Sequence, residues 1–110
     1  MKIYKPNADP FESEDPFCVD VVDDVAGTVE PLQFPGGVHA HSPDGFAWGY
    51  GGSGPAELAR AILGDHLGRE PSTHTYQDFK FAKLAKLDPK GLDWKITSDE
   101  IAAWLGGRRA

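Results

Sequence analysis

Apolar and polar residues alternate along residues 17–22, and this alternation predicts a β-strand with one apolar face. A shorter extended segment is predicted at residues 3–4, before a loop in which three prolines remove backbone hydrogen-bond donors. After a turn at residues 23–27, another strand begins at residues 28–29. Pro31 restricts this last strand to a sheet edge or a bulge, because proline cannot donate to the strand ladder.

A hairpin is predicted over residues 38–50. Its tight turn spans residues 42–45, where Pro43 fixes its own φ and Gly45 tolerates the positive φ that such turns need. In the second strand, alternation places three aromatic residues on one face: Phe46, Trp48 and Tyr50. Aromatic rings bury a large apolar area, so we expect this face to lie in the core; if exposed, it would be a contact surface instead.

Helical periodicity begins after a Gly-Gly-Ser-Gly loop at residues 51–54. Pro55 suits the first position of a helix, because that position needs no backbone N–H. The apolar residues that follow share one face, whereas Glu57 and Arg60 fall on the other. We expect the helix to end before Gly68. The glycines of the loop would let the backbone pass close to aromatic side chains, and its serine would help to cap the helix.

Two further helices are predicted. One spans residues 75–87 and ends at residues 88–91, where proline and glycine oppose its continuation. The other begins with a capping box, in which the Thr97 hydroxyl accepts from the backbone N–H of Glu100 and the Glu100 carboxylate reaches back. Gly106 is expected to end this helix with a positive φ.

Strands precede helices along the chain, with one further short strand predicted at residues 94–96. This order predicts an α+β fold, with a small antiparallel sheet of about four strands and two to three helices packed on one face. The 110 residues suit a single domain, residues 1–110, with an acidic Pro-rich loop at 6–16 and a frayed tail at 107–110.

Composition narrows the class of protein. A single cysteine excludes an internal disulfide and a zinc site built on several thiolates, and it suits a reducing cytoplasm. There is no apolar run of the roughly 18 residues that a membrane span needs, and the first residues lack an apolar signal segment. His39 and His41 share a face of an extended segment, but nothing orders further ligands around them. We therefore expect no metal and no cofactor.

The net charge of −6 lies entirely in the first thirty residues. Residues 1–30 hold two basic and eight acidic side chains, whereas residues 31–110 hold nine of each. Such a field attracts basic surfaces and repels nucleic acid. We therefore expect a partner-binding edge made of seven carboxylates: Asp9, Glu12, Glu14, Asp15, Asp20, Asp23 and Asp24. The simpler alternative is a solvated acidic loop that aids solubility.

A basic and aromatic surface over residues 80–95 is one alternative site. It would bind nucleic acid through phosphate contacts and base stacking, and its residues are Tyr76, Lys80, Lys83, Lys86 and Lys90. The overall pI of about 5.0 argues against direct nucleic-acid binding. Lysine stems that cover a packed helix explain the same pattern.

The glycine-rich loop before the first helix is another alternative site. Its free backbone N–H groups and the helix dipole favour an anion such as phosphate, and its residues are Gly51, Gly52, Ser53 and Gly54. Pro55 removes one donor and also breaks the Gly-x-Ser-x-Gly pattern of a nucleophile elbow. The loop also lacks the lysine of a nucleotide P-loop. Because neither motif is complete, no catalytic residue is assigned.

Residues 41–59 read His-Ser-Pro-Asp-Gly-Phe-Ala-Trp-Gly-Tyr-Gly-Gly-Ser-Gly-Pro-Ala-Glu-Leu-Ala. This run resembles the hallmark block of an uncharacterised family of small proteins from phages, prophages and bacterial mobile elements. The resemblance continues more loosely and covers about the last seventy residues. It implies a phage or mobile-element protein acting in a bacterial cytoplasm, with no enzymatic activity to carry over. The acidic stretch at residues 9–24 is longer than the N-terminal segment that the resemblance implies.

Charge and resemblance together predict a non-enzymatic binding protein. Its acidic edge would contact a basic surface of a bacterial host protein, and a natural target for a phage protein is a defence nucleoprotein complex. The edge would occupy the nucleic-acid channel as a DNA mimic, in the manner of anti-CRISPR inhibitors. Direct nucleic-acid binding and anion binding are the alternatives, and both a monomer and a homodimer stay open.

Overall fold

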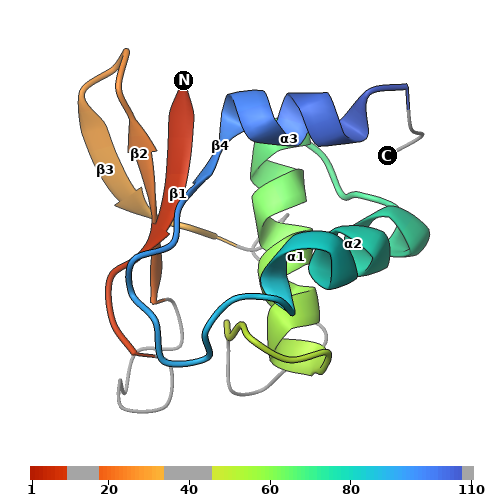
Figure 1. Cartoon of the computed structure of the whole chain (residues 1–110). Helices are drawn as coiled ribbons and strands as arrows, with labels where there is room; N and C mark the ends of the chain where they lie inside the picture. The colour runs from red at the N-terminus through yellow and green to blue at the C-terminus, as the bar shows by residue number, and fades with distance from the viewer. Residues whose placement is uncertain (10–17, 34–45, 108–110) are drawn as a thin grey trace.

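A four-stranded antiparallel sheet lies beside three helices in this computed structural model, whose described residues are 1–9, 18–33 and 46–107 (Figure 1). The strands follow the order β3-β2-β1-β4. Their bounds are Lys2–Pro6 for β1, Val19–Asp23 for β2, Thr28–Pro31 for β3 and Ile96–Thr97 for β4. This architecture confirms the predicted α+β class with a small antiparallel sheet.

Strand β1 is central because it pairs with β2 on one side and with β4, from the far end of the chain, on the other. Tyr4 lies opposite both Val21 and Ile96, and its side chain is fully buried. The Tyr4 hydroxyl donates to Asp65 of the first helix at 2.6 Å, which ties the sheet to the helices. Strand β3 is the edge that Pro31 predicts, and all of its residues are exposed.

The helices are α1 (Ser53–Leu67), α2 (Thr73–Phe79) and α3 (Ser98–Leu105), and a short π-helix, η2 (Lys80–Leu84), continues α2. None of the described helices is long and apolar enough to cross a membrane. Helix α1 begins at Ser53, so Pro55 is its third residue and not its first as predicted. The third position also needs no N–H donor within the helix. Gly68 ends α1 with φ 72°, which confirms the predicted end.

The helix predicted over residues 75–87 is an α-helix followed by a wider π-turn. Ser72 caps the start of α2, where its hydroxyl accepts from the N–H of Thr75. At the end of η2 the N–H of Ala85 donates to the carbonyl of Lys80, five residues earlier, at 2.8 Å. Single π-turns inside helices occur frequently at functional sites, and this one begins at Lys80.

Helix α3 has half of the predicted capping box. The Thr97 hydroxyl accepts from the N–H of Glu100 at 3.1 Å, as predicted. The Glu100 carboxylate does not reach back, and lies instead 3.3 Å from Nζ of Lys83 in η2. At the other end Gly106 has φ −3°, so the predicted positive φ is wrong there and occurs at Gly107.

The predicted hairpin is wrong in its described part. Residues 46–48 belong to no strand of the sheet, and residues 34–45, which include His39 and His41, lie outside the described residues. Two of the three aromatic residues are buried as expected, but Tyr50 is 43% exposed. Gly49, which lies between Trp48 and Tyr50, has φ 87°, so the chain turns there and the alternation is broken.

Helix α1 is the central element of the core. Every residue from Gly54 to Gly64 is buried, because the helix contacts α2, η2 and α3 and is tied to the sheet. Beside it, the Trp48 ring is fully buried and lies edge-on to Trp94, with 5.1 Å between centroids. Burial on all sides means that polar residues of α1 cannot face solvent as a single polar stripe.

Candidate anion-binding site

A hollow of about 340 Å³ lies where the start of α1 meets α2 and η2. Its lining residues are Gly51, Gly52, Ser53, Ala56, Gln77 and Lys80. Three of the four loop residues predicted to bind an anion therefore line one hollow. The structure adds Lys80, a residue that sequence reasoning assigned to the alternative nucleic-acid surface.

Lys80 is a buried cation at the wall of this hollow. The residue is 5% exposed, and its Nζ donates to the carbonyl of Gly51 at 2.9 Å. Nζ also lies 4.1 Å from the ring centroid of Phe81, within the range of a cation–π contact. No carboxylate forms an ion pair with Lys80 within residues 1–9, 18–33 and 46–107. Desolvation lowers the pKa of Lys80, because burial disfavours the charged ammonium.

The start of α1 adds backbone donors. Gly52 is the N-cap residue and offers no side chain, so the predicted capping role of Ser53 is wrong. Among the described residues, no acceptor receives a hydrogen bond from the N–H of Ser53 or of Gly54. The first turn also carries no acidic residue. The positive end of the helix dipole therefore lies beside the hollow without a neutralising group from this part of the chain.

Close contacts explain two glycines of the loop. A Cβ added to Gly52 would lie 2.5 Å from Cε2 of Tyr50, and one added to Gly54 would lie 2.7 Å from the Cβ of Ala47. The prediction that these glycines let the backbone pass close to aromatic side chains is confirmed at Gly52. Gly54 belongs to this packing and does not line the hollow.

Helix α1 also holds a buried charge cluster that sequence reasoning missed. Arg60 donates to both carboxylate oxygens of Glu70, from Nε at 2.5 Å and from Nη2 at 3.0 Å, and this pairing raises the pKa of Arg60. Its Nη1 lies 3.7 Å from Oε2 of Glu57. Glu57 is 0% exposed, and neither of its oxygens accepts a hydrogen bond within the described residues. The prediction that Glu57 and Arg60 form a polar face opposite the apolar one is therefore wrong.

The basic and aromatic set does not form one exposed surface. Tyr76 and Lys80 are buried, so the Tyr76 ring is not available for stacking. Lys83 forms an ion pair with Glu100, whereas Lys86 and Lys90 are exposed.

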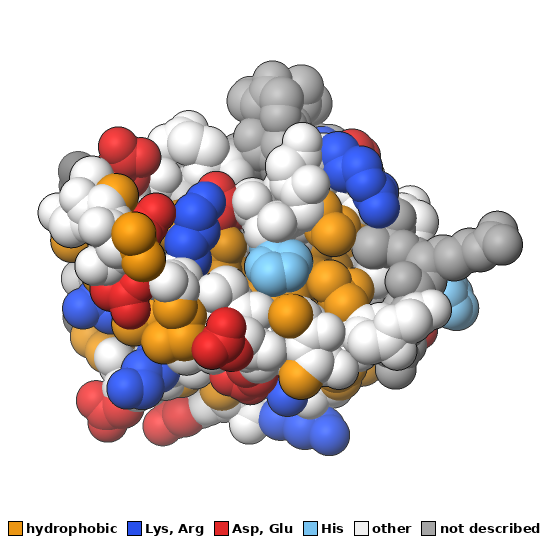
Figure 2. All heavy atoms as spheres, turned by 90° about the horizontal axis from the view of Figure 1, so that it is seen from above, with side chains coloured by type: hydrophobic (Ala, Val, Ile, Leu, Met, Phe, Trp, Pro, Cys, Tyr) orange, Lys and Arg blue, Asp and Glu red, His pale blue; other side chains and the backbone are white. Residues whose placement is uncertain are grey.

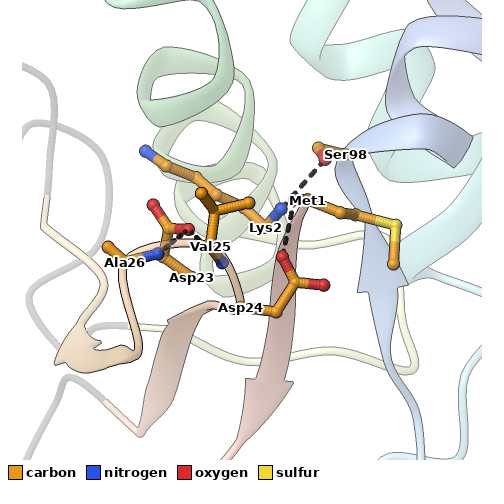
Figure 3. A network of polar contacts seen from close by, with 7 residues as sticks. All are labelled: Met1, Lys2, Asp23, Asp24, Val25, Ala26 and Ser98. Atoms are coloured by element: carbon orange, nitrogen blue, oxygen red, sulfur yellow. Dashed lines mark hydrogen bonds and ion pairs between the residues drawn. The ribbon is translucent and has the colours of Figure 1, made fainter.

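Four of the seven predicted partner-binding carboxylates lie in the described part of the chain, and two of these have contacts at the turn after β2. Figure 3 shows Asp23 accepting from the N–H groups of Val25 and Ala26, each at 3.1 Å, within the turn after β2. These backbone donors, that of Ala26 first, lower the pKa of Asp23. In the same view Asp24 accepts from the amino terminus of Met1 at 2.7 Å.

Asp20 accepts from the side-chain amide of Asn7 at 2.9 Å, and Asp9 is also described. The other predicted acidic residues lie outside the described part of the chain: Glu12, Glu14 and Asp15. Figure 2, which views the molecule from above Figure 1, shows acidic side chains interspersed with basic ones on that face. The acidic partner-binding edge stays a prediction.

Comparisons with known proteins identify the family but no activity. Searches of the curated proteins and of the solved structures find no match. Residues 16–107 match a family of unknown function, DUF6166. The match begins well before the last seventy residues, so Asp20, Asp23 and Asp24 lie within the family's length. Because the match covers most of the chain, this protein belongs to the DUF6166 family of unknown function.

Proposed function

We propose that the protein binds a small anionic ligand of the phosphate class in the hollow at the start of α1. The observation that carries this proposal is Lys80, a buried ammonium group without a carboxylate partner among the described residues. An unpaired buried charge is costly, so proteins normally pair it or bind an ion against it. An anion in the hollow would supply the missing charge.

The hollow also offers donors in the number that an oxyanion needs. Nζ of Lys80 has three N–H groups, and the carbonyl of Gly51 accepts one of them. Ser53, which has a backbone N–H without an acceptor in the described residues, and Gln77, which carries a side-chain amide, line the same space. Phosphate binding at helix N-termini rests on this combination of free amides and a positive dipole end. The lysine provides the full charge that the amides lack.

Replacing Lys80 with methionine tests the proposal, because it keeps the stem and removes the charge. We expect the Lys80→Met variant to bind inorganic phosphate about 10- to 100-fold more weakly, as charge-assisted hydrogen bonds are lost. Isothermal titration calorimetry on both proteins measures the difference. The matched control is Lys95→Met, an exposed lysine outside the hollow, which should change the affinity less than about twofold. Equal phosphate binding by the wild type and the Lys80→Met variant would contradict the proposal.

The lowered pKa of Lys80 gives the binding a pH dependence with a definite sign. The anion pairs with the protonated amine, so affinity should fall as the pH rises through the lowered pKa, below the ordinary value of 10.5. Sulfate is the probe for this series, since its charge is constant there. In the Lys80→Met variant the same pH series should leave the residual affinity unchanged.

A second candidate function follows from the charge distribution. We propose that residues 9–24 contact a basic surface of a bacterial host protein, in the manner of an acidic DNA mimic. The proposal includes an origin in a phage or mobile element, a non-enzymatic role, and a defence nucleoprotein complex in the cytoplasm as the partner. Its support is that the first thirty residues carry the whole net charge of −6.

Charge reversal of Glu12, Glu14 and Asp15 to lysine tests this second candidate. These three are chosen because Asp20, Asp23 and Asp24 have structural contacts that reversal would also break. We expect the variant to lose capture of a basic host complex from a nuclease-treated bacterial lysate. Reversal of the exposed Asp93 and Asp99 is the control and should keep capture. Undiminished capture by the first variant would contradict the second candidate.

A further inference from the structure

Two large aromatic side chains are exposed beside the hollow. Tyr50 is 43% exposed and Phe81 is 56% exposed, although most aromatic residues of the described chain lie in the core. Exposed aromatic rings that flank a polar cavity frequently mark a contact surface for a ligand. The neighbouring Lys80 is buried, so both rings are more accessible to solvent than this cation.

Both rings contact the loop whose backbone lines the hollow. A Cβ added to Gly51 would lie 3.1 Å from Cε1 of Phe81, and one added to Gly52 would lie 2.5 Å from Cε2 of Tyr50. Gly51 and Gly52 themselves line the cavity. Phe81 thus lies against Gly51 and Tyr50 against Gly52, so both rings lie next to the proposed anion position.

Lys80 connects the anion position to one ring. Lys80 lines the hollow and its Nζ lies 4.1 Å from the Phe81 centroid, while Phe81 keeps more than half of its surface exposed. A ligand whose phosphate reaches Nζ would thus bring the atoms attached to that phosphate close to Phe81, and Tyr50 lies against the neighbouring loop residue Gly52. A planar aromatic group at that distance could stack on the exposed ring surface.

We propose that the ligand is a nucleoside phosphate, with its phosphate in the hollow and its base stacked on Phe81 or Tyr50. This inference rests on the proposed anion site and adds the chemical class of the group attached to the anion. Every base has a π-face, so stacking on an aromatic side chain gives affinity with little base preference. A free mononucleotide and the 5′-phosphorylated end of a single strand present the same chemistry.

The test compares three probes that share a phosphate group: inorganic phosphate, ribose 5-phosphate and adenosine 5′-monophosphate. We expect the wild-type protein to bind adenosine 5′-monophosphate about 10-fold or more tightly than ribose 5-phosphate, the range given by one base stacked on an aromatic ring. Calorimetry or ligand-observed NMR measures each affinity. A 5′-phosphorylated oligodeoxyadenylate as a fourth probe distinguishes a free nucleotide from a strand end, and base-dependent binding of either one supports the inference.

Phe81→Leu separates stacking from charge. More than half of the ring is exposed, so the variant should fold. It removes the cation–π contact of Lys80 but keeps the ammonium group and the loop backbone. We expect the ratio of its affinities for adenosine 5′-monophosphate and ribose 5-phosphate to fall toward one. The affinity of the same variant for ribose 5-phosphate measures any effect of the lost cation–π contact on the anion site itself. Tyr50→Leu is the second variant, because the base can use either ring. Leu92→Ala removes another exposed apolar side chain, outside the hollow, and should change neither affinity.

The outcomes keep this inference distinct from the proposed function. If ribose 5-phosphate and the nucleotide bind with equal affinity, the anion site stands and the stacking inference is overturned. If the double variant Tyr50→Leu/Phe81→Leu keeps the full preference for the nucleotide, stacking on these rings is also overturned. If neither phosphate nor any phosphate ester binds, the proposed function and the inference fail together.

Discussion

Arg60→Met is expected to lower the free energy of unfolding by about 3–5 kcal/mol, because it leaves the buried Glu57 carboxylate without a counter-ion. Arg60 is 5% exposed and is the only cation within ion-pair distance of Glu57 among the described residues. It also holds Glu70 through two hydrogen bonds at 2.5 and 3.0 Å. Methionine keeps most of the volume of the side chain, so the cost comes from charge and hydrogen bonding and not from a cavity.

Glu57→Met, which replaces the other member of this ion pair, should change the free energy of unfolding much less, and any change should be an increase. Glu57 accepts no hydrogen bond in the described part of the chain, so Glu57→Met removes a costly buried charge and leaves Arg60 paired with Glu70. We expect stability to stay equal or to rise by about 1 kcal/mol. Urea denaturation followed by tryptophan fluorescence measures both variants. Equal destabilisation by the two substitutions would show that Glu57 contributes a favourable interaction of its own.

Local sequence chemistry was enough to predict much of the fold. Strand β2, the edge position of β3 and the end of α1 at Gly68 follow from alternation, from proline and from glycine. The Thr97 cap likewise depends only on residues three positions apart. Each of these features is decided by neighbours along the chain, so a single sequence contains the information for it.

Tertiary packing decided the features that sequence patterns did not predict. Helix α1 is buried around its whole circumference from Gly54 to Gly64, so Glu57 and Arg60 could not form a solvent-facing stripe. In an amphipathic pattern, charged residues indicate the exposed side only when one side of the helix is free. The prediction of a hairpin was wrong in its described part for a related reason. Gly49 lies against Pro89 and donates to the carbonyl of Leu84, and these contacts come from residues far away in the sequence.

Only the part of the candidate site that is formed by consecutive residues was predicted. The Gly-Gly-Ser-Gly loop indicated an anion site from residues that are consecutive in sequence. Lys80 lies 29 residues beyond Gly51, the residue whose carbonyl it contacts, and no spacing rule connects the two. The π-turn that begins at Lys80 breaks the regular period of the helix, so the assumed helical spacing did not reveal which way this lysine points.

Gly49→Ala is the second substitution with a large expected effect, and it tests how the loop before α1 is fixed. Gly49 has φ 87°, where a residue with a Cβ is strained by about 1–2 kcal/mol. The added Cβ would also lie 2.6 Å from the Cα and the N of Pro89, and backbone atoms cannot move aside as a flexible side chain can. Overpacking of this kind costs about 1–3 kcal/mol further.

We therefore expect Gly49→Ala to lower the free energy of unfolding by about 4 kcal/mol in urea denaturation. Gly27→Ala is the matched control, since Gly27 has φ 71° but an added Cβ would meet no atom within 4 Å. The control should lose only the conformational part, about 1–2 kcal/mol. The N–H of Gly49 donates to the carbonyl of Leu84 at 2.8 Å, so a shift at Gly49 also moves the loop relative to η2 and Lys80. At temperatures where the Gly49→Ala variant is still folded, its phosphate affinity should therefore fall, whereas that of Gly27→Ala should stay unchanged. Similar losses of stability in the two variants would show that contact with Pro89 does not hold the loop.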